Sequence, residues 1–255
     1  MRALAVPILL AFATLLAAAP SRAADPNTLW KIVSERCVPN ELAHADPSPC
    51  SKVELAGGLA RGYVVLKDRD GRTQYLVMPT ARVTGIESPL LLAPDAPNYF
   101  AAAWHEIGRV PRAAGRPLGL DDLSLAVNSA LGRSQNQLHI HLDCVRVDVR
   151  EALRRRAPSL GRHWAPLGEP LLGHRYLALR VMAPDLDKID PFRLLADGIP
   201  AARAAMDQWT LVAVGILSED NVPGFVLLAG HVDPALGDWA SGEELQDHDC
   251  AVAGY

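Results

Sequence analysis

The stretch that decides the fold reads Gln135-Asn136-Gln137-Leu138-His139-Ile140-His141-Leu142-Asp143-Cys144. Apolar and polar residues alternate strictly from Leu138 to Asp143, which is the period of a half-buried β-strand. The three aliphatic side chains fall on one face and anchor the strand in the core. His139, His141 and Asp143 fall on the other face. The pattern therefore predicts a rigid strand that presents three groups able to bind protons, metals or phosphorus.

A second strand and a polar turn precede this stretch. Residues 123–128 have the composition of a strand, and residues 129–134 form a turn around Gly132. A strand, a polar glycine-containing loop and a histidine-bearing strand together suit an anion cradle with a nucleophile beside it.

The composition is that of an ordinary globular protein. The chain has 255 residues, a net charge of −4, 49% hydrophobic residues and 21% charged residues. It is long enough for a full core in one large domain or two small ones. Domains that bind nucleic acid usually carry a strong basic excess, so the mild acidity argues against a nucleic-acid partner.

The N-terminus has the features of an export signal. One positive residue, Arg2, precedes an apolar run over residues 3–19, and Ser21-Arg22-Ala23 fits the small-x-small pattern of a cleavage point. Residues 1–23 therefore read as a cleaved signal peptide. An uncleaved membrane anchor is the alternative, although the run is slightly short and Pro7 interrupts it. Both alternatives export the remainder of the chain.

Export gives the four cysteines a role. An even count in an oxidising compartment indicates disulfides, and none of the spacings is that of a CxxC metal or redox pair. Four cysteines allow three pairings. Cys37 and Cys50 flank a proline-rich loop and are close in sequence, so we expect Cys37–Cys50 and, with it, Cys144–Cys250.

The remaining elements divide the mature chain into two halves. In residues 24–160 we expect helices over 26–36, 97–109 and 147–157, a loop over 37–52, and strands over 62–67 and 74–78 joined through Asp70-Gly71. In residues 161–255 we expect a strand over 176–182, a helix from Asp190-Pro191, and a hairpin of 209–217 with 225–229. This second half has no His-x-His. It reads as a supporting extension of the same domain or as a degenerate copy of the first half.

Several runs resemble a known family. Asn128, Ser134-Gln135 and His139-x-His141 have the spacing of the histidine-triad (HIT) superfamily of nucleotide hydrolases and transferases. Four longer runs resemble the bacterial CDP-diacylglycerol pyrophosphatases, and together they span nearly the whole mature chain. They are residues 29–33, residues 74–80 with 85–92, residues 135–141, and Gln246-Asp247-His248-Asp249-Cys250.

The resemblance implies both a fold and an activity. The fold would be α+β, with a HIT-like antiparallel sheet, flanking helices, and His139 and His141 exposed on a central strand. The activity would be hydrolysis of the pyrophosphate bond of CDP-diacylglycerol to CMP and phosphatidate. A membrane lipid as substrate implies work at a membrane surface, on the periplasmic side of the bacterial inner membrane. Asp143 departs from the superfamily pattern, because a third histidine would stand there, and its role is left open.

The chemistry can also be argued from the residues. A neutral imidazole can form a phosphoramidate and so divide one hard displacement into two easier ones. His141, at the centre of the ladder, is the predicted nucleophile, and His139 lies about 7 Å away on the same face. Ser134, Gln135 and Asn128 are the predicted phosphate-binding residues. This scheme requires no cofactor and no metal.

Two other classes of function remain open from sequence. His139, His141 and Asp143 could be ligands of a zinc hydrolase or lyase, which a chelator would inactivate. The chain could also be an exported binding module without chemistry. Of the other histidines, His248 lies beside Cys250, and we expect a structural role for it. Arg146, Arg150 and Arg154 recur every fourth residue and predict a solvated helix face, or else a surface that meets lipid phosphates. The sequence leaves open the oligomeric state, the acyl-chain pocket and the breadth of nucleotide substrates.

Overall fold

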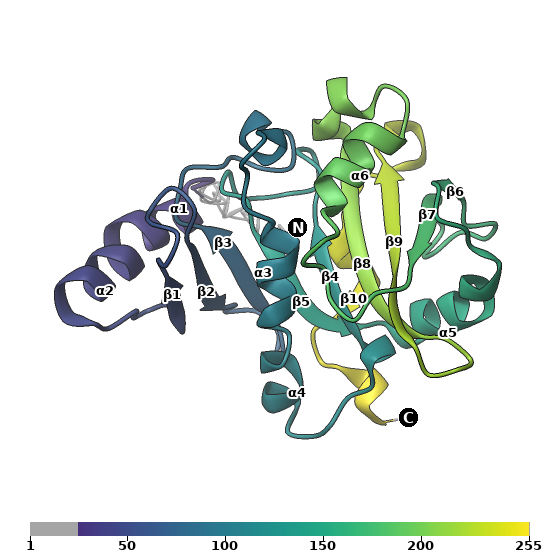
Figure 1. Cartoon of the computed structure of the whole chain (residues 1–255), viewed down its shortest axis with the longest axis horizontal. Coiled ribbons are helices and arrows are strands. Elements are labelled where there is room, and N and C mark those ends of the chain that lie inside the picture. The colour runs from purple at the N-terminus through teal and green to yellow at the C-terminus, as the bar shows by residue number, and fades with distance from the viewer. Residues whose placement is uncertain (1–24, 255) are drawn as a thin grey trace, which may run out of the picture.

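The computed structural model describes residues 25–254, in which ten strands form one antiparallel sheet (Figure 1). The sheet runs through both halves of the chain and carries helices on its faces, so the fold class is α+β. Its strand order is β1 (Lys52–Glu54), β2 (Tyr63–Lys67), β3 (Tyr75–Pro79), β5 (Ile140–Val145), β4 (Leu123–Val127), β8 (Trp209–Leu217), β9 (Pro223–His231), β7 (Tyr176–Val181) and β6 (Ala165–Pro166). The short strand β10 (Gln246–Asp247) also pairs with β5.

Helices cover both faces of this sheet. On one face lie α3 (Tyr99–His105) and α6 (Pro191–Gly198), which are in front of the strands in Figure 1. The ring of Phe100 on α3 meets the ring of Phe192 on α6 edge to face. On the other face, α5 (Val147–Arg156) packs on the strands of the second half. The same face of β2 and β3 is covered by a helical arm made of α1 (Thr28–Ile32), a π-helical turn (Val33–Cys37) and α2 (Val38–His44).

The alternation in the histidine-bearing stretch is confirmed. Leu138, Ile140 and Leu142 are fully buried in the core between the sheet and helices α3 and α6. His141 pairs across the ladder with Leu76 on β3 and with Ala126 on β4, so it shares the opposite face of the sheet with them. Strand β5 is interior to the sheet, and His139 directly precedes its first residue.

Most of the expected strands form where the patterns place them. Strands β2 and β3 make the expected hairpin, and β8 and β9 make the second one, with β9 running to His231. Asp190 caps α6, because its side chain accepts hydrogen bonds from the backbone N–H groups of Phe192 and Arg193. Strand β10 was not expected, because two residues are too few to carry an alternation pattern.

Two expected helices have different bounds. The helix expected over 26–36 continues to His44, so the loop expected over 37–52 is mostly helical. Pro39 is the second residue of α2 and directly follows the π-helical turn over Val33–Cys37, so it falls in a first helical turn, where its missing N–H is tolerated. The helix expected over 97–109 ends at His105, and a separate α4 (Arg109–Ala114) follows Gly108.

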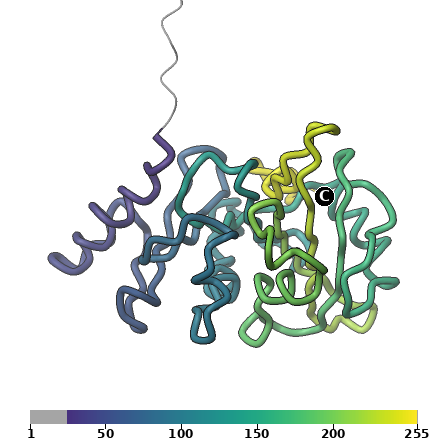
Figure 2. The backbone as a smooth tube through the Cα atoms, turned by 90° about the horizontal axis from the view of Figure 1, so that it is seen from above, coloured from purple at the N-terminus to yellow at the C-terminus, as the bar shows by residue number. Residues whose placement is uncertain are grey.

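The C-terminal segment ties the two halves together. Strand β10 occupies the part of the β5 edge that β3 leaves free, since β3 pairs with β5 only up to Leu142 and β10 pairs with Cys144 and Val145. In the view from above, the yellow C-terminal segment and the green α6 segment lie on opposite sides of the molecule (Figure 2). Both expected disulfides, Cys37–Cys50 and Cys144–Cys250, are present.

The expected export segment, residues 1–23, lies outside the described residues. Within residues 25–254, no helix combines the length and the apolar character that crossing a bilayer demands.

Candidate active site

The three histidines His139, His141 and His248 line one cavity of about 560 Å³. The cavity lies over the sheet face that carries His141. The helical arm contributes to one wall, and Glu243 and His248 from the C-terminal segment contribute to another. Gln74, at the start of β3, and Asn128, at the end of β4, also line it. The site is therefore assembled from segments at both ends of the described residues.

His141 is held at its Nδ1 side by two polar partners. Its Nδ1 lies 3.0 Å from the Gln74 amide nitrogen and 3.3 Å from Glu243 Oε1. Its Nε2 is buried and has no hydrogen-bond partner among residues 25–254. The side chain is only 4% accessible, and burial lowers the pKa of His141 well below its ordinary value. His141 is therefore neutral at physiological pH, with Nε2 left for a substrate group.

His139 is held by its own backbone. Its Nδ1–H donates to the Gln137 carbonyl at 2.6 Å, so its Nε2 carries the lone pair. The two imidazole rings meet edge to face with centroids 4.8 Å apart, closer than the spacing of about 7 Å expected along a strand. Burial also lowers the pKa of His139. The sequence predicted exposed histidines, and this is wrong for both rings, because the C-terminal segment and the helical arm enclose the strand face.

Glu243 supplies the negative charge of the site. Its Oε1 accepts from the Gln74 amide at 2.9 Å, and its Oε2 accepts from the Asn128 amide at 3.1 Å. Burial opposes its ionisation, but these two amide donors and the positive charge of nearby His248 outweigh burial and hold the pKa of Glu243 below its ordinary value. An ionised carboxylate thus faces Nδ1 of His141, the arrangement that orients an imidazole and stabilises positive charge on it.

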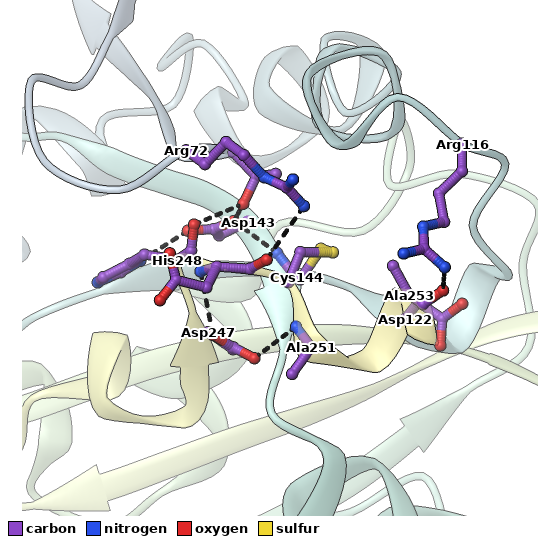
Figure 3. The surroundings of a disulfide bond; sticks show 12 residues. Arg72, Arg116, Asp122, Asp143, Cys144, Asp247, His248, Ala251 and Ala253 are labelled. Atoms are coloured by element: carbon purple, nitrogen blue, oxygen red, sulfur yellow. Dashed lines mark hydrogen bonds and ion pairs between the residues drawn. A yellow bond between two sulfur atoms is a disulfide. The ribbon is translucent and has the colours of Figure 1, made fainter. Parts of the chain in front are cut away.

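Asp143 lies outside the cavity lining and holds His248. Its carboxylate accepts from Thr73 Oγ1 at 2.5 Å, from the Cys144 N–H at 2.8 Å and from His248 Nδ1 at 2.6 Å (Figure 3). Asp143 is fully buried, whereas the His248 side chain is 36% exposed. The hydrogen bond that its Nδ1–H donates to Asp143 raises the pKa of His248. The residue that departs from the triad pattern therefore recruits a third histidine from elsewhere in the chain.

The backbone fixes His248 closely. Its carbonyl accepts from the N–H groups of Arg72 and Thr73, and the Cys144–Cys250 bridge lies two residues further along the chain (Figure 3). Gly71 has φ +75°, and a Cβ there would lie 2.5 Å from the His248 Cβ. Only glycine satisfies both the left-handed backbone and this close approach. The structural role expected for His248 is thus incomplete, because its ring also lines the cavity.

The predicted phosphate-binding residues have mixed positions. Ser134 is exposed and lines the cavity. The Gln135 side chain accepts from the Leu29 N–H and donates to the Asp25 carbonyl, so it fastens the start of the helical arm. Asn128 donates to Glu243 and accepts from the Glu243 N–H, so it fastens the C-terminal segment. These interactions make Gln135 and Asn128 positioning residues in this structure.

The metal triad of the alternative zinc enzyme does not come together. Asp143 directs its oxygens to Thr73, Cys144 and His248 rather than to the space beside His139 and His141. In the part of the chain that the structure describes, no group of three or more His, Cys, Asp or Glu side chains is arranged to hold a metal ion. The cavity instead brings together imidazoles and a carboxylate, which are groups capable of proton transfer and nucleophilic attack.

The arginines of α5 are paired. Arg150 is buried against Asp122, Arg146 bonds Asp148, and Arg154 bonds Asp121. The expected solvated helix face is therefore wrong for Arg150, and the charges of this row are largely neutralised by neighbouring carboxylates. The row lies outside the residues that line the cavity.

Three cavity residues could not be assigned from the histidine motif. Glu243 lies 102 positions after His141 and has no motif of its own. For His248, the sequence signal was the run from Gln246 to Cys250, which resembles the pyrophosphatases. Gln74 likewise begins a run with the same resemblance. A local spacing rule cannot bring such distant residues to one histidine.

Comparison with known proteins gives a consistent result. A family model described as CDP-diacylglycerol pyrophosphatase matches residues 24–254, which include every residue of the cavity. A curated CDP-diacylglycerol pyrophosphatase of Yersinia pestis is 42% identical over 231 residues, which is 91% of this chain and 86% of that relative.

Proposed function

This chain belongs to the CDP-diacylglycerol pyrophosphatase family, and on that premise we propose how its cavity hydrolyses CDP-diacylglycerol to CMP and phosphatidate. The enzyme is a hydrolase of a phosphorus anhydride. Its substrate is a membrane lipid, so the proposal includes work at a membrane surface. The histidine-lined cavity supports the proposal, because cleaving a diphosphate by covalent catalysis needs a neutral imidazole that can attack phosphorus.

The proposed first step is attack by His141. Its Nε2 bonds to the phosphorus nearest cytidine, the bond from that phosphorus to the bridging oxygen breaks, and phosphatidate leaves with the electron pair. In the second step water attacks the same phosphorus, the N–P bond breaks, and CMP is released. Glu243, 3.3 Å from Nδ1, stabilises the positive charge that His141 acquires while it carries the nucleotide.

One observation carries this assignment. His141 Nε2 is a buried polar atom without a partner in residues 25–254, on a ring whose other nitrogen faces an ionised carboxylate. A buried polar atom left unsatisfied is unfavourable by about 1–3 kcal/mol, so native sites that contain one commonly reserve it for a ligand.

His139 is the second candidate for the nucleophile, and a specific hydrogen bond favours it. Because His139 Nδ1–H donates to a backbone carbonyl, the lone pair is on Nε2 without any rearrangement. For the lone pair of His141 to be on Nε2, its proton must be on Nδ1, toward Glu243. The nearby Gln74 N–H instead favours the tautomer with the lone pair on Nδ1. Trapping the covalent adduct in each alanine variant decides between the two rings.

The direct test follows the label from heavy-oxygen water in a single turnover. Attack on the phosphorus nearest cytidine puts the label in CMP. Label in phosphatidate would place the attack on the other phosphorus and overturn the mechanism. An acid-labile, cytidine-labelled adduct on wild-type protein, absent from His141→Ala, supports His141. An adduct that persists in His141→Ala and is lost in His139→Ala moves the assignment to His139.

We also propose that the first half is a HIT-like catalytic unit and that the second half is its degenerate copy. The antiparallel sheet supports this proposal, since β4 of the first half pairs with β8 of the second and each half contributes neighbouring antiparallel strands. The second half has lost the His-x-His and keeps its aliphatic strands. A superposition of β7–β9 on the strands of the first half that fails to match their order and direction would exclude the copy.

For location, we propose the periplasmic side of a bacterial inner membrane. The export-type sequence of residues 1–23 and the two disulfides support it. Mass spectrometry of the exported protein distinguishes a cleaved chain that starts near Ala24 from an intact chain retained in the membrane. A cytoplasmic protein with reduced cysteines would contradict both versions.

A further inference from the structure

His248 has the geometry of an acid–base group rather than of a structural histidine. Asp143 fixes its Nδ1 side at 2.6 Å, and its ring lines the same cavity as His139 and His141. Its Nε2 lies 3.6 Å from Glu243 Oε1, the carboxylate that also faces His141. One nitrogen is therefore committed to a buried carboxylate, and the other reaches the centre of the site.

We propose that His248 is the acid–base residue of both chemical steps, with Asp143 as its positioning partner. This inference rests on the hydrolysis proposed above. In the first step, the imidazolium of His248 gives its Nε2 proton to the phosphatidate oxygen as the bond to the bridging oxygen breaks. In the second step, neutral His248 takes a proton from the attacking water while the N–P bond breaks. The proton count closes over one turnover, and no other reactant is needed.

The groups that face His248 are consistent with this cycle. The Asp143 carboxylate accepts a hydrogen bond from Nδ1–H, Glu243 lies on the Nε2 side, and Asp68 is the further carboxylate in the surroundings of His248. His141 is the neighbouring imidazole. Three carboxylates around one imidazole favour its protonated form, which the first step requires, and the partial exposure of the ring gives water access for the second step.

The test separates the two chemical steps in the full-length protein, with CDP-diacylglycerol and a p-nitrophenyl ester of CMP as substrates. Both leaving groups are weakly basic, so formation of the adduct depends little on a proton donor, whereas hydrolysis of the adduct needs a base for the attacking water. In His248→Gln, we expect the nitrophenolate burst to stay within about threefold of wild type, while steady-state CMP release falls about a hundredfold or more on both substrates. The covalent adduct then accumulates, because its hydrolysis lacks the base.

The matched control is His231→Gln. His231 is an exposed histidine that stacks on Trp209 and lies outside the cavity, so both rates should equal those of wild type. Equal losses of His248→Gln on both substrates without adduct accumulation would show a structural role and overturn the inference. Wild-type rates in His248→Gln would do the same. A wild-type protein that releases no CMP would instead contradict the proposed function.

A second observation concerns the aliphatic side chains in the cavity lining. They are Leu29 and Ile32 from the helical arm, Pro49, and Leu66 and Leu76 from β2 and β3. Leu29, Ile32 and Leu66 are only partly buried. Arg36 and Lys67 line the same cavity.

The geometry points to these aliphatic side chains as the subsite for the glycerol and proximal acyl carbons of the lipid. The reacting diphosphate must lie at the histidines, and Leu76 pairs with His141 across the sheet, so apolar surface adjoins the reacting group. Aliphatic side chains beside two cations suit acyl chains next to a phosphate.

The test for this subsite, which also rests on the proposed function, uses Ile32→Gln and Leu66→Gln. Against CDP-diacylglycerol in mixed micelles, we expect kcat/KM to fall about tenfold, since each loses apolar contact with the chain. Against CDP-glycerol, which lacks acyl chains, the change should stay below about twofold. The control is Leu42→Gln, on α2 of the same arm but 63% exposed and outside the cavity.

Equal losses on both substrates, or equal losses in Leu42→Gln, would overturn the subsite. Its failure is separable from failure of the enzyme function, because binding of dihexanoyl phosphatidate can be measured by calorimetry without turnover. Weaker binding in Ile32→Gln but not in Leu42→Gln supports the subsite, and equal binding contradicts it.

Discussion

His248 Nδ1 lies 2.6 Å from Asp143 Oδ2, although the two residues are 105 positions apart in the chain. Asp143 stands where the HIT pattern has its third histidine, and it uses that position to hold an imidazole delivered by the C-terminal segment. The aspartate at position 143 and the placement of His248 in the cavity therefore belong to one arrangement. The cavity keeps three histidines while the strand itself supplies two.

Replacing Asp143 by Asn should shift the pH dependence of the reaction. The Asp143 carboxylate raises the pKa of His248, so the imidazolium persists to higher pH in wild type. Its contribution is complete below the ordinary histidine pKa of about 6.5 and is lost as pH rises through the raised value. In Asp143→Asn the alkaline limb of kcat/KM should move to lower pH. An unchanged alkaline limb of kcat/KM would show that the protonation of His248 does not control the rate.

Alanine variants of the two strand histidines should differ in severity. His141→Ala should lower kcat by at least about a thousandfold, because it removes the predicted attacking atom. His139→Ala should lower kcat less, because it removes stabilisation and orientation. Steady-state release of CMP measures both variants, and the reverse order of severity would favour His139 as the nucleophile.

Glu243→Gln should lower kcat with little effect on KM. The change keeps the size of the side chain and removes the negative charge 3.3 Å from His141 Nδ1. We expect a loss of about ten- to a hundredfold, which is typical for a partner that orients an imidazole. Asn128→Asp is a useful companion, because it places a second carboxylate against Glu243 and should displace the C-terminal segment. A Glu243→Gln variant with wild-type kcat would show that the carboxylate only fastens that segment.

The two disulfides should separate stability from activity. Removing Cys37–Cys50, which closes a loop of 13 positions, should lower the free energy of unfolding by about 3 kcal/mol and leave kcat largely intact. Removing Cys144–Cys250, which spans 106 positions, should lower it by up to about 4.7 kcal/mol and also lower kcat, because His248 lies two residues from the bridge. Denaturant unfolding and CMP release, measured on the Cys→Ala pairs, give the two quantities. Equal activity in both pairs would show that β10 alone places His248.

A chelator should leave hydrolysis unchanged. The proposed steps use imidazole and carboxylate groups alone, whereas a zinc hydrolase loses its activated water with the metal. The measurement is CMP release after dialysis against a chelator, with and without added zinc. Loss of activity that zinc restores would establish the metal-dependent alternative.

Local pattern determined much of the fold and part of the site. The alternation from Leu138 to Asp143 predicted which side chains enter the core, because a strand between two layers must alternate. Asp70-Gly71 predicted the β2–β3 hairpin, and cysteine spacing favoured the pairing that the structure has. Helix ends were predicted less well at Pro39 and Gly108, where neighbouring turns, rather than the punctuating residue alone, decide whether a helix continues.

By itself, then, the sequence determined the class of fold, the strand that carries His139 and His141, the disulfide framework and the resemblance to the pyrophosphatase family. Tertiary structure alone decided that Glu243 faces His141, that Asp143 holds His248, and that Gln135 and Asn128 fasten neighbouring segments. The physical reason is separation along the chain. Periodicity reports which face of an element is buried, whereas contacts across a hundred residues depend on where β10 pairs and on how the helical arm packs. Those are properties of the assembled sheet, and the chemistry of the cavity arises from them.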